Sequence, residues 1–453
     1  MSDATERYPI DTEQARVSVK KPEVRADEQG EMSDDERVAL AMQHFAKDFG
    51  YTAAVHMDSC IHCGMCAEAC HYYVPTEDPK YTPIWKIEVF KQAYKREAGP
   101  FAFFYKLFNL KPSVTADELR EWQELLYDSC SVCGRCSMIC PMGIDIASLI
   151  SQARHGMFKA GLIPDELHAV AERAETEGSP LGAKPDVFED RVEWMGDEND
   201  MEIPMDKEKA DVLLTMSSIE IMKYPQSIAA TAKVMEHLGL DYTFSTKGYE
   251  ATNFGLLSGN IDWQRDMSMR IINAAIDIGA KYVILPECGH AYSALRWQGA
   301  TMYGKPLPFK IRHISEFLAE QIEAGNLKLK QDNVAGSVTF HDPCQVVRRG
   351  GAIEAPRVVM DALGVDLKEM APSRGFNYCC GGGGGVITIH RADDIRYKSF
   401  QVKMKQVEES GAERLVSSCS NCRQTFDDGQ THFNWDKTCE SLLELVADNL
   451  VEE

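Results

Sequence analysis

Long apolar runs are missing from this sequence of 453 residues. The longest, such as residues 210–216 and 282–286, fall far short of the roughly 20 residues that a membrane-spanning helix needs. The first residues, Met1 to Ala4, form neither a basic nor an apolar segment, so the N-terminus does not have the pattern of a signal peptide. We therefore expect a soluble, cytoplasmic protein.

A surplus of positive charge is also missing, because 70 acidic residues outweigh 48 basic ones and leave a net charge of −22. This balance argues against a nucleic-acid partner and against direct docking on an anionic membrane surface. No Gly-x-Gly-x-x-Gly motif follows a predicted strand, so we expect no nicotinamide or flavin site in this chain.

Cysteine, by contrast, is abundant: the chain has 15, a number that points to metal or redox chemistry in a cytosolic protein. Residues 1–48 are polar and are expected to be a disordered tail, which ends in a predicted helix over residues 33–49. Residues 49–164 hold eight of the cysteines. Residues 165–209 contain fifteen acidic and five basic residues and are predicted to form a surface linker.

From residue 210 onward, apolar strands alternate with helical patterns, which predicts parallel α/β layers. This part also repeats itself. Val234-Met-Glu-His-Leu-Gly-Leu-Asp241 lines up with Val359-Met-Asp-Ala-Leu-Gly-Val-Asp366. The predicted fold is therefore α+β overall: a helical two-cluster ferredoxin-like domain is followed by two repeated α/β units, over residues 210–332 and 333–453.

Two cysteine motifs in the N-terminal domain have the spacing of a two-cluster ferredoxin. In such proteins, three cysteines at this pitch bind one cubane and the fourth reaches the other cluster. A zinc site also uses Cys-x-x-Cys pairs, but it needs only four ligands in all. We therefore predict two cubane 4Fe-4S clusters: cluster A on Cys60, Cys63, Cys66 and Cys140, and cluster B on Cys130, Cys133, Cys136 and Cys70.

An aromatic segment, residues 100–109, lies between the two motifs. The simpler interpretation is a helix that packs on the core of its domain. The alternative is a docking surface for another subunit.

Five further cysteines occur on three predicted loops near the C-terminus. Cys344 is followed by the pair Cys379 and Cys380 and then by Cys419-x-x-Cys422. Five thiolates are too many for one zinc ion, and adjacent cysteines suit a cluster with several irons. The glycine run at residues 381–385 would let the backbone approach such a cluster without side-chain clashes.

This pattern resembles the cysteine-rich CCG domain family of heterodisulfide reductases. In that family, five such cysteines bind a non-cubane 4Fe-4S cluster that cleaves or forms disulfides. The resemblance implies that the ligands of this cluster are Cys344, Cys379, Cys380, Cys419 and Cys422.

The first repeat unit departs from the CCG pattern. Ser218 stands where the second unit has Cys344, and Ala291 stands where it has Cys422. Only Cys288, aligned with Cys419, remains, and one thiolate cannot hold a cluster. We therefore expect the first unit to be cluster-free.

Three side chains of the two units are left with two interpretations each. We hypothesise that Cys288 and His290 are catalytic and that Cys288 faces the substrate channel across a pseudo-twofold interface, whereas the alternative is an inert core position. His341 either takes part in the site or only caps a loop. A fourth residue, Cys439, lies in a predicted helical stretch, residues 437–449, and is expected in the core.

From about residue 50, the chain resembles the K subunit of Dsr membrane complexes (DsrK) and the related catalytic D subunit of membrane heterodisulfide reductase. The residues concerned include 243–250, 253–255, 287–290 and the complete second motif. The resemblance implies electron exchange between a quinone-linked membrane cytochrome b subunit and a cytoplasmic DsrC-like sulfur carrier that presents a disulfide or trisulfide. It also implies a location on the inner face of the cytoplasmic membrane, held there by a partner subunit.

Two other functions remain open at this point. The chain could be the iron–sulfur subunit of a glycolate- or lactate-type oxidase that serves a flavin subunit. It could also be a non-catalytic relay in which the CCG cluster only passes electrons.

Overall fold

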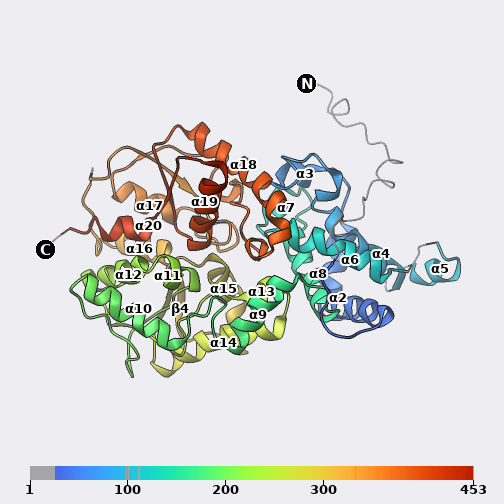
Figure 1. Cartoon of the computed structure of the whole chain (residues 1–453), viewed down its shortest axis with the longest axis horizontal. Coiled ribbons are helices and arrows are strands. Elements are labelled where there is room, and N and C mark those ends of the chain that lie inside the picture. The colour runs from blue at the N-terminus through green and yellow to red at the C-terminus, as the bar shows by residue number, and fades with distance from the viewer. Residues whose placement is uncertain (1–25, 98, 100, 111–112, 332, 452–453) are drawn as a thin grey trace.

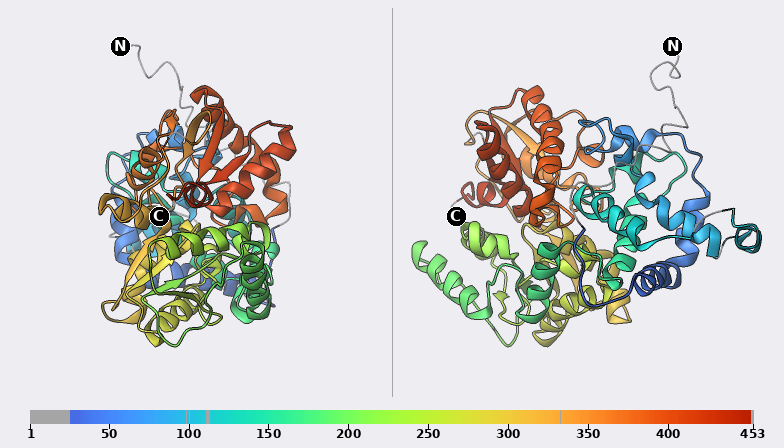
Figure 2. Two further views of the ribbon diagram at one scale, coloured as in Figure 1. Left: turned by 90° about the vertical axis from the view of Figure 1, so that its left-hand side faces the viewer. Right: turned by 45° about the vertical axis from the view of Figure 1, so that its right-hand side comes forward.

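The computed structural model describes residues 26–97, 99, 101–110, 113–331 and 333–451, and the predicted tail therefore lies largely outside the described residues. The chain forms a helical domain and two α/β units that lie one above the other beside it (Figures 1 and 2). The predicted fold class is thus confirmed. No helix among the described residues is long and apolar enough to cross a bilayer.

The N-terminal domain contains helices and no strand in its described part. Its elements are α2 (Asp34–Asp58), α3 (Met65–Ala69), η1 (Pro79–Tyr81), η2 (Trp85–Ile87), α4 (Glu88–Glu97), α5 (Ala102–Leu107), α6 (Ala116–Gln123), η3 (Glu124–Asp128), α7 (Arg135–Ile139) and α8 (Ile146–Lys159).

Helix α2 corrects the prediction of a disordered tail for the part of residues 1–48 that the structure describes. The Ser33 hydroxyl caps this helix by accepting from the Glu36 backbone N–H. Ala41 and Phe45 are buried, and α2 packs on α8. The predicted helix over residues 33–49 exists but continues to Asp58. The many charged residues of this segment made its sequence look disordered, although its apolar residues form a face of the helix that is buried in the domain.

Each α/β unit is built on a four-stranded parallel sheet. The first unit contains β1 (Val212–Leu214), α11 (Ser218–Lys223), α12 (Gln226–His237), β2 (Tyr242–Phe244), α13 (Phe254–Ser258), α14 (Ile261–Asp277), β3 (Tyr282–Leu285), α15 (Gly289–Tyr303), β4 (Lys310–His313) and α16 (Ile314–Glu323). The second contains β5 (Ser337–His341), α17 (Ala355–Ala362), β6 (Asp366–Leu367), η4 (Arg374–Phe376), η5 (Val386–Thr388), η6 (His390–Ala392), α18 (Asp393–Ser410), β7 (Arg414–Ser417), α19 (Ser420–Phe433), β8 (Cys439–Ser441) and α20 (Leu442–Ala447).

The two sheets share one topology, because their strand orders are β2-β1-β3-β4 and β6-β5-β7-β8. Helix α12 packs on α20, and α16 packs on α17. Since α12 corresponds to α17 and α16 to α20, these two contacts exchange under a pseudo-twofold axis. The internal repeat predicted from the sequence therefore describes both the fold of each unit and the way the units pair.

The predicted acidic linker, residues 165–209, is not a linker. It contains α9 (Asp165–Thr176) and α10 (Pro185–Glu198), each with apolar residues at helical spacing. Leu167, Ala171 and Ala174 are buried in α9, and Phe188 of α10 stacks on Tyr249 of the first unit. The acidic residues occupy the solvent side, so the charge count concealed two amphipathic helices.

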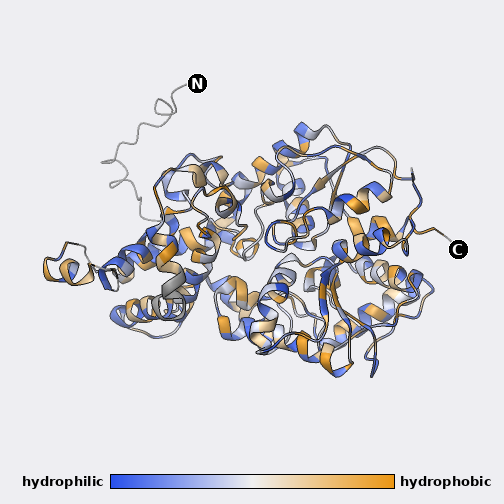
Figure 3. Ribbon diagram, turned by 180° about the vertical axis from the view of Figure 1, so that it is seen from behind, coloured by the Kyte–Doolittle hydropathy of each residue, from blue (hydrophilic) through white to orange (hydrophobic). Residues whose placement is uncertain are grey.

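Two smaller predictions also need correction. Helix α5, within residues 100–109, has no buried residue, so it does not pack on the core of its domain. Figure 3 shows it as a projecting helix with apolar residues. Cys439 is buried as predicted, but it begins strand β8 at the edge of the second sheet rather than lying in a helix.

One buried cation joins all three parts of the chain. The guanidinium of Arg154, on α8, donates to the backbone carbonyls of Leu126 at 2.9 Å and Cys130 at 2.7 Å in its own domain. It also donates to Leu257 of the first unit at 2.8 Å and to Gly384 of the second at 2.6 Å. The planar fork of arginine suits several acceptors at once.

We predict that Arg154→Met destabilises the assembly of the three parts, because it leaves four buried carbonyls without their donor. The free energy of unfolding should fall by about 3 kcal/mol or more. Denaturant titration and limited proteolysis of the full chain would measure the loss. Arg265→Met, at an exposed position on α14, is the control and should change little. Equal stability of the two variants would contradict this role.

Candidate iron–sulfur sites

The four cysteines assigned to cluster A line one small cavity at the surface. Cys60, Cys63, Cys66 and Cys140 all contribute to its wall, although Cys140 comes from the second motif. Cys63 is exposed, and the apolar side chains of Ile61 and Met142 beside it are 61% and 47% exposed. The structure therefore brings Cys140 of the second motif beside the first three cysteines of the first motif, and the exchange of the fourth ligand stays a prediction.

The cysteines assigned to cluster B also lie close together, and each is partly buried. Burial raises the pKa of the free Cys70 and Cys136 thiols, and the neighbouring cysteines of the same group raise that of Cys136 further. Gly64 and Gly134 start α3 and α7 with φ of +77° and +75°, which favours glycine at both places. The two motifs therefore fold as equivalent loops, and α3 packs on α7.

The five C-terminal cysteines form one continuous buried group. The Sγ atoms of Cys344 and Cys379 lie 3.7 Å apart, and those of Cys380 and Cys422 lie 3.4 Å apart. Hydrogen bonds between thiols also join Cys379 to Cys380 and Cys422 to Cys419. Close packing of five thiols without disulfides is the donor set of a cluster with several irons, so the residues present fit the predicted group.

Parallel-sheet geometry explains how distant segments supply these thiols. Cys344 follows the end of β5, and Cys419 follows β7 as the N-cap of α19. Because β5 and β7 are neighbours, their carboxyl ends open at the same edge. Cys422 lies in the first turn of α19, and the Cys379–Cys380 pair comes from the segment before α18.

The cysteines assigned to cluster B lie next to the C-terminal group of cysteines. Cys133 hydrogen-bonds with Cys379, and this contact raises the pKa of the Cys133 thiol. The Ser131 hydroxyl donates to Cys379 Sγ at 3.4 Å. Arg348 donates to the Cys133 carbonyl at 2.9 Å, which ties the second unit to the ferredoxin loop. The three cysteine groups thus lie in series, from the surface at cluster A to the C-terminal group.

The glycine run at residues 381–385 has packing contacts that the sequence did not predict. A Cβ at Gly384 would lie 2.7 Å from the backbone carbon of Ser131, and one at Gly382 would lie 2.0 Å from Thr425 Oγ1. Gly384 therefore lets the second unit approach the ferredoxin loop, whereas Gly382 lets the run pack on α19 of its own unit. Close approach of this backbone to an iron cluster stays a prediction.

A cavity of about 210 Å³ lies between the two α/β units, next to the C-terminal group. Cys288 and His290 of the first unit and Cys419 of the second line it, together with the glycine run and apolar side chains. The units meet here through the Ser420 backbone N–H, which donates to the Glu287 carbonyl at 3.0 Å. The structure thus brings the predicted residues Cys288 and His290 to one cavity.

Burial determines the protonation of both residues. It raises the pKa of Cys288 well above the usual range for a thiol, so this side chain is un-ionised near pH 7. Burial and the nearby Arg154 cation lower the pKa of His290 to about 4, so its ring is neutral. His290 Nε2 accepts from the Gly384 backbone N–H at 3.4 Å, which gives the ring a structural contact.

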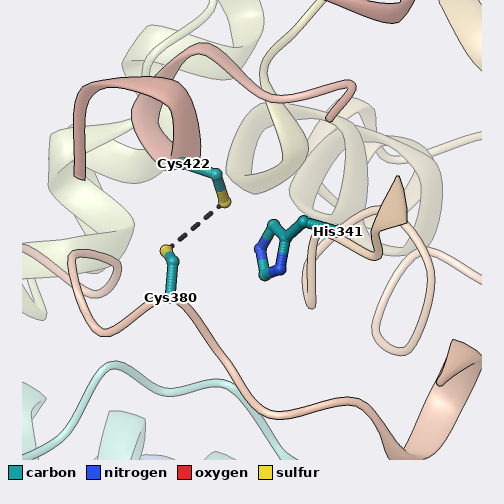
Figure 4. A group of neighbouring side chains, drawn as sticks. All are labelled: His341, Cys380 and Cys422. Carbon is teal, nitrogen blue, oxygen red and sulfur yellow. Dashed lines mark hydrogen bonds between the residues drawn. The ribbon is translucent and has the colours of Figure 1, made fainter. Parts of the chain in front are cut away.

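Two further buried side chains lie beside the C-terminal group. Lys403, on α18, was not identified from the sequence; it donates to Asn377 Oδ1 at 2.5 Å, and burial lowers its pKa to about 7, although the nearby Asp342 and cysteines oppose this shift. His341, at the end of β5, points toward Cys380 and Cys422 (Figure 4). Neither of its ring nitrogens makes a hydrogen bond, so it does not cap a loop.

Arg154 was missed as well, and no local signal marks it. Its partners are carbonyls from segments up to 230 residues away. Lys403 and His341 likewise meet the cysteines only through the tertiary fold.

Comparisons with known proteins agree with this arrangement. A 4Fe-4S dicluster domain model matches residues 56–144, and a cysteine-rich domain model, named CCG, matches residues 338–427. The D subunit of dihydromethanophenazine:CoB–CoM heterodisulfide reductase from Methanosarcina barkeri is 27% identical over 87% of this chain and 94% of its own. The Hdr-like menaquinol oxidoreductase iron–sulfur subunit 2 of Archaeoglobus fulgidus is 26% identical over 87% and 80%.

A solved structure of a hypothetical protein from Helicobacter pylori covers 93% of this chain and 78% of its own, with a TM-score of 0.47 and 12% identity. The two domain models coincide with the cysteine groups described above, and the relatives align over most of the chain. The chain is therefore a homologue of the D-type iron–sulfur subunits of heterodisulfide reductases, with a 4Fe-4S dicluster domain and a CCG domain.

Proposed function

We propose that this protein is the iron–sulfur catalytic subunit of a membrane-associated complex. It would move electrons between a quinone-linked cytochrome b subunit and a sulfur–sulfur bond on a cytoplasmic DsrC-like carrier. The names of the relatives support an oxidoreductase subunit that works with partners, since they include a heterodisulfide reductase and a menaquinol oxidoreductase.

The observation that carries this proposal is the contact between Cys133 and Cys379. It joins a ferredoxin-type site to the five-cysteine group, whose predicted cofactor is a non-cubane 4Fe-4S cluster. When bound, the three clusters would supply one-electron transfer from the protein surface to the cavity between the α/β units. A zinc-binding or purely structural cysteine group would have no need for this adjacency.

The cavity residues suit a sulfur substrate. Cleavage of a disulfide takes up two electrons and two protons and releases two thiols. The un-ionised thiol of Cys288, which lines the cavity beside the five-cysteine group, would supply one of these protons, and the second would come from solvent. The reverse direction would return the same proton to Cys288.

Substitution of one C-terminal ligand tests the cluster assignment. Cys380→Ser should lower the iron content from about twelve to about eight per chain, because three clusters of four irons are proposed. It should also abolish disulfide reduction while both cubanes stay reducible. Anaerobic iron analysis, EPR and a reductase assay with the sulfur carrier would measure these effects.

A second variant, Cys379→Ser, should be compared with Cys380→Ser. Because Cys379 contacts Cys133, this substitution should also disturb the EPR signal of cluster B, whereas Cys380→Ser should not. Wild-type protein with about eight irons would refute the third cluster, since that is the content of the two cubanes alone. Unchanged reductase activity in Cys380→Ser would favour a non-catalytic relay or another electron acceptor.

The cavity thiol gives a second test. Cys288→Ala should leave the iron content unchanged and lower turnover with the carrier by about tenfold or more, because a substrate-facing proton donor is lost. Cys439→Ala removes an equally buried cysteine that does not line the cavity, and it should keep full activity. Full activity in both variants would identify Cys288 as an inert core residue.

Helix α5 is the proposed docking surface for the membrane subunit. Four phenylalanines of this region, at positions 101, 103, 104 and 108, are each more than half exposed, and an apolar patch of this kind usually marks an interface. Figure 1 shows α5 at the end of the molecule opposite the C-terminus.

We predict that the double variant Phe103→Ser/Phe104→Ser weakens association with the cytochrome b subunit by at least about tenfold, because it removes two large apolar contacts. Anaerobic co-purification of the complex would measure this loss. Phe376→Ser, at an exposed aromatic residue of the second unit, is the control. Undiminished association of the double variant would assign the docking surface elsewhere.

A further inference from the structure

The imidazole of His341 is buried, and its surroundings offer no hydrogen-bond partner to its ring nitrogens. The side chain has no exposed surface, and both Nδ1 and Nε2 lack a hydrogen-bond partner. Buried polar side chains are nearly always hydrogen-bonded, so an unpaired ring of this kind indicates a missing partner. The partner must come from outside the described residues of the chain.

The direction of the ring identifies that partner. One ring nitrogen of His341 and the Sγ atoms of Cys380 and Cys422 all lie within 4.8 Å of one another, and Figure 4 shows the ring beside both cysteines. Phe426 packs edge-on against the ring at 5.2 Å between centroids, which holds its orientation. The Ser417 hydroxyl donates to the His341 carbonyl at 3.3 Å and fixes the backbone.

The repeat provides an internal comparison. The offset that aligns Val234 with Val359 places Met216 where the second unit has His341, and the strand register agrees. Met216 is fully buried, and its side chain needs no hydrogen-bond partner. The unit without the five cysteines thus also lacks the unpaired histidine, and the unit with them has both.

We propose that His341 is a positioning residue of the C-terminal cluster and donates a ring N–H hydrogen bond to one of its sulfur atoms near Cys380 and Cys422. Thiolate and sulfide sulfur accept hydrogen bonds, and the ring faces the sulfur atoms of Cys380 and Cys422. The inference rests on the proposed function, because it requires a cluster on the five cysteines.

Such a donor has a measurable electronic effect. A hydrogen bond to cluster sulfur stabilises the reduced form, which carries more negative charge, and so raises the reduction potential. His341→Leu should therefore make the potential of this cluster more negative. We expect the ratio of reduced to oxidised cluster at a fixed potential to fall about tenfold, which is about 59 mV for a one-electron step.

The experiment is an anaerobic redox titration of the full-length holoprotein, followed by EPR, with iron analysis of each variant. His341→Gln retains an N–H donor and should restore most of the potential. His155→Leu removes another buried histidine, whose Nδ1 pairs with the Gly259 carbonyl at 2.8 Å, and it should leave the potential unchanged. The potentials of both cubanes should be the same in all variants.

Separate outcomes identify which proposal fails. An unchanged potential in His341→Leu would overturn the hydrogen bond while leaving the proposed function intact. Loss of about four irons in both His341→Leu and His341→Gln would also overturn it, in favour of imidazole as an iron ligand. Wild-type protein with only about eight irons would refute the proposed cluster itself, and the inference with it.

Discussion

The burial of the Arg154 cation, which pairs with no carboxylate in the part of the chain that the structure describes, is the constraint on which the arrangement of this protein depends. Its charge is satisfied by carbonyls from the helical domain and both α/β units. Burial lowers its pKa, and the nearby Cys130 opposes that shift when it is a thiolate. A negatively charged iron–sulfur cluster held by Cys130 would stabilise the same cation that aligns the three parts, so cofactor charge and tertiary structure would support each other.

The grouping of the cysteines could be predicted from the sequence, because cysteines that bind one cluster recur at a fixed spacing within a short segment. The strand β3, within residues 282–286, was likewise visible as a short apolar run. Helices α9 and α10 were missed because acidic residues on their solvent side dominated the count, while Phe188 and its neighbours formed the buried face. His341 and Lys403 acquire their importance only through contacts that the fold creates.

Duplication of the α/β unit separates two tasks that one unit would have to combine. The second unit keeps the cysteines, whereas the first supplies the opposite wall of the cavity with Cys288 and His290. Glu287, just before Cys288, is fully buried and pairs with Arg423 of the second unit at 3.1 Å. The first unit therefore retains its place at the site through interface contacts, although it no longer has the thiols to hold a metal cluster.

The close approach of the glycine run to Ser131 also has a consequence for how fast electrons can move. Gly384 packs directly against the backbone of Ser131, and Arg348 and Arg154 donate to carbonyls across the same contact, so the second unit is held against the ferredoxin loop. Electron transfer between the proposed clusters would then depend on a fixed separation between sites rather than on a hinge. Its rate should be insensitive to solvent viscosity, and any viscosity dependence of turnover would report on the arrival and departure of the partner proteins.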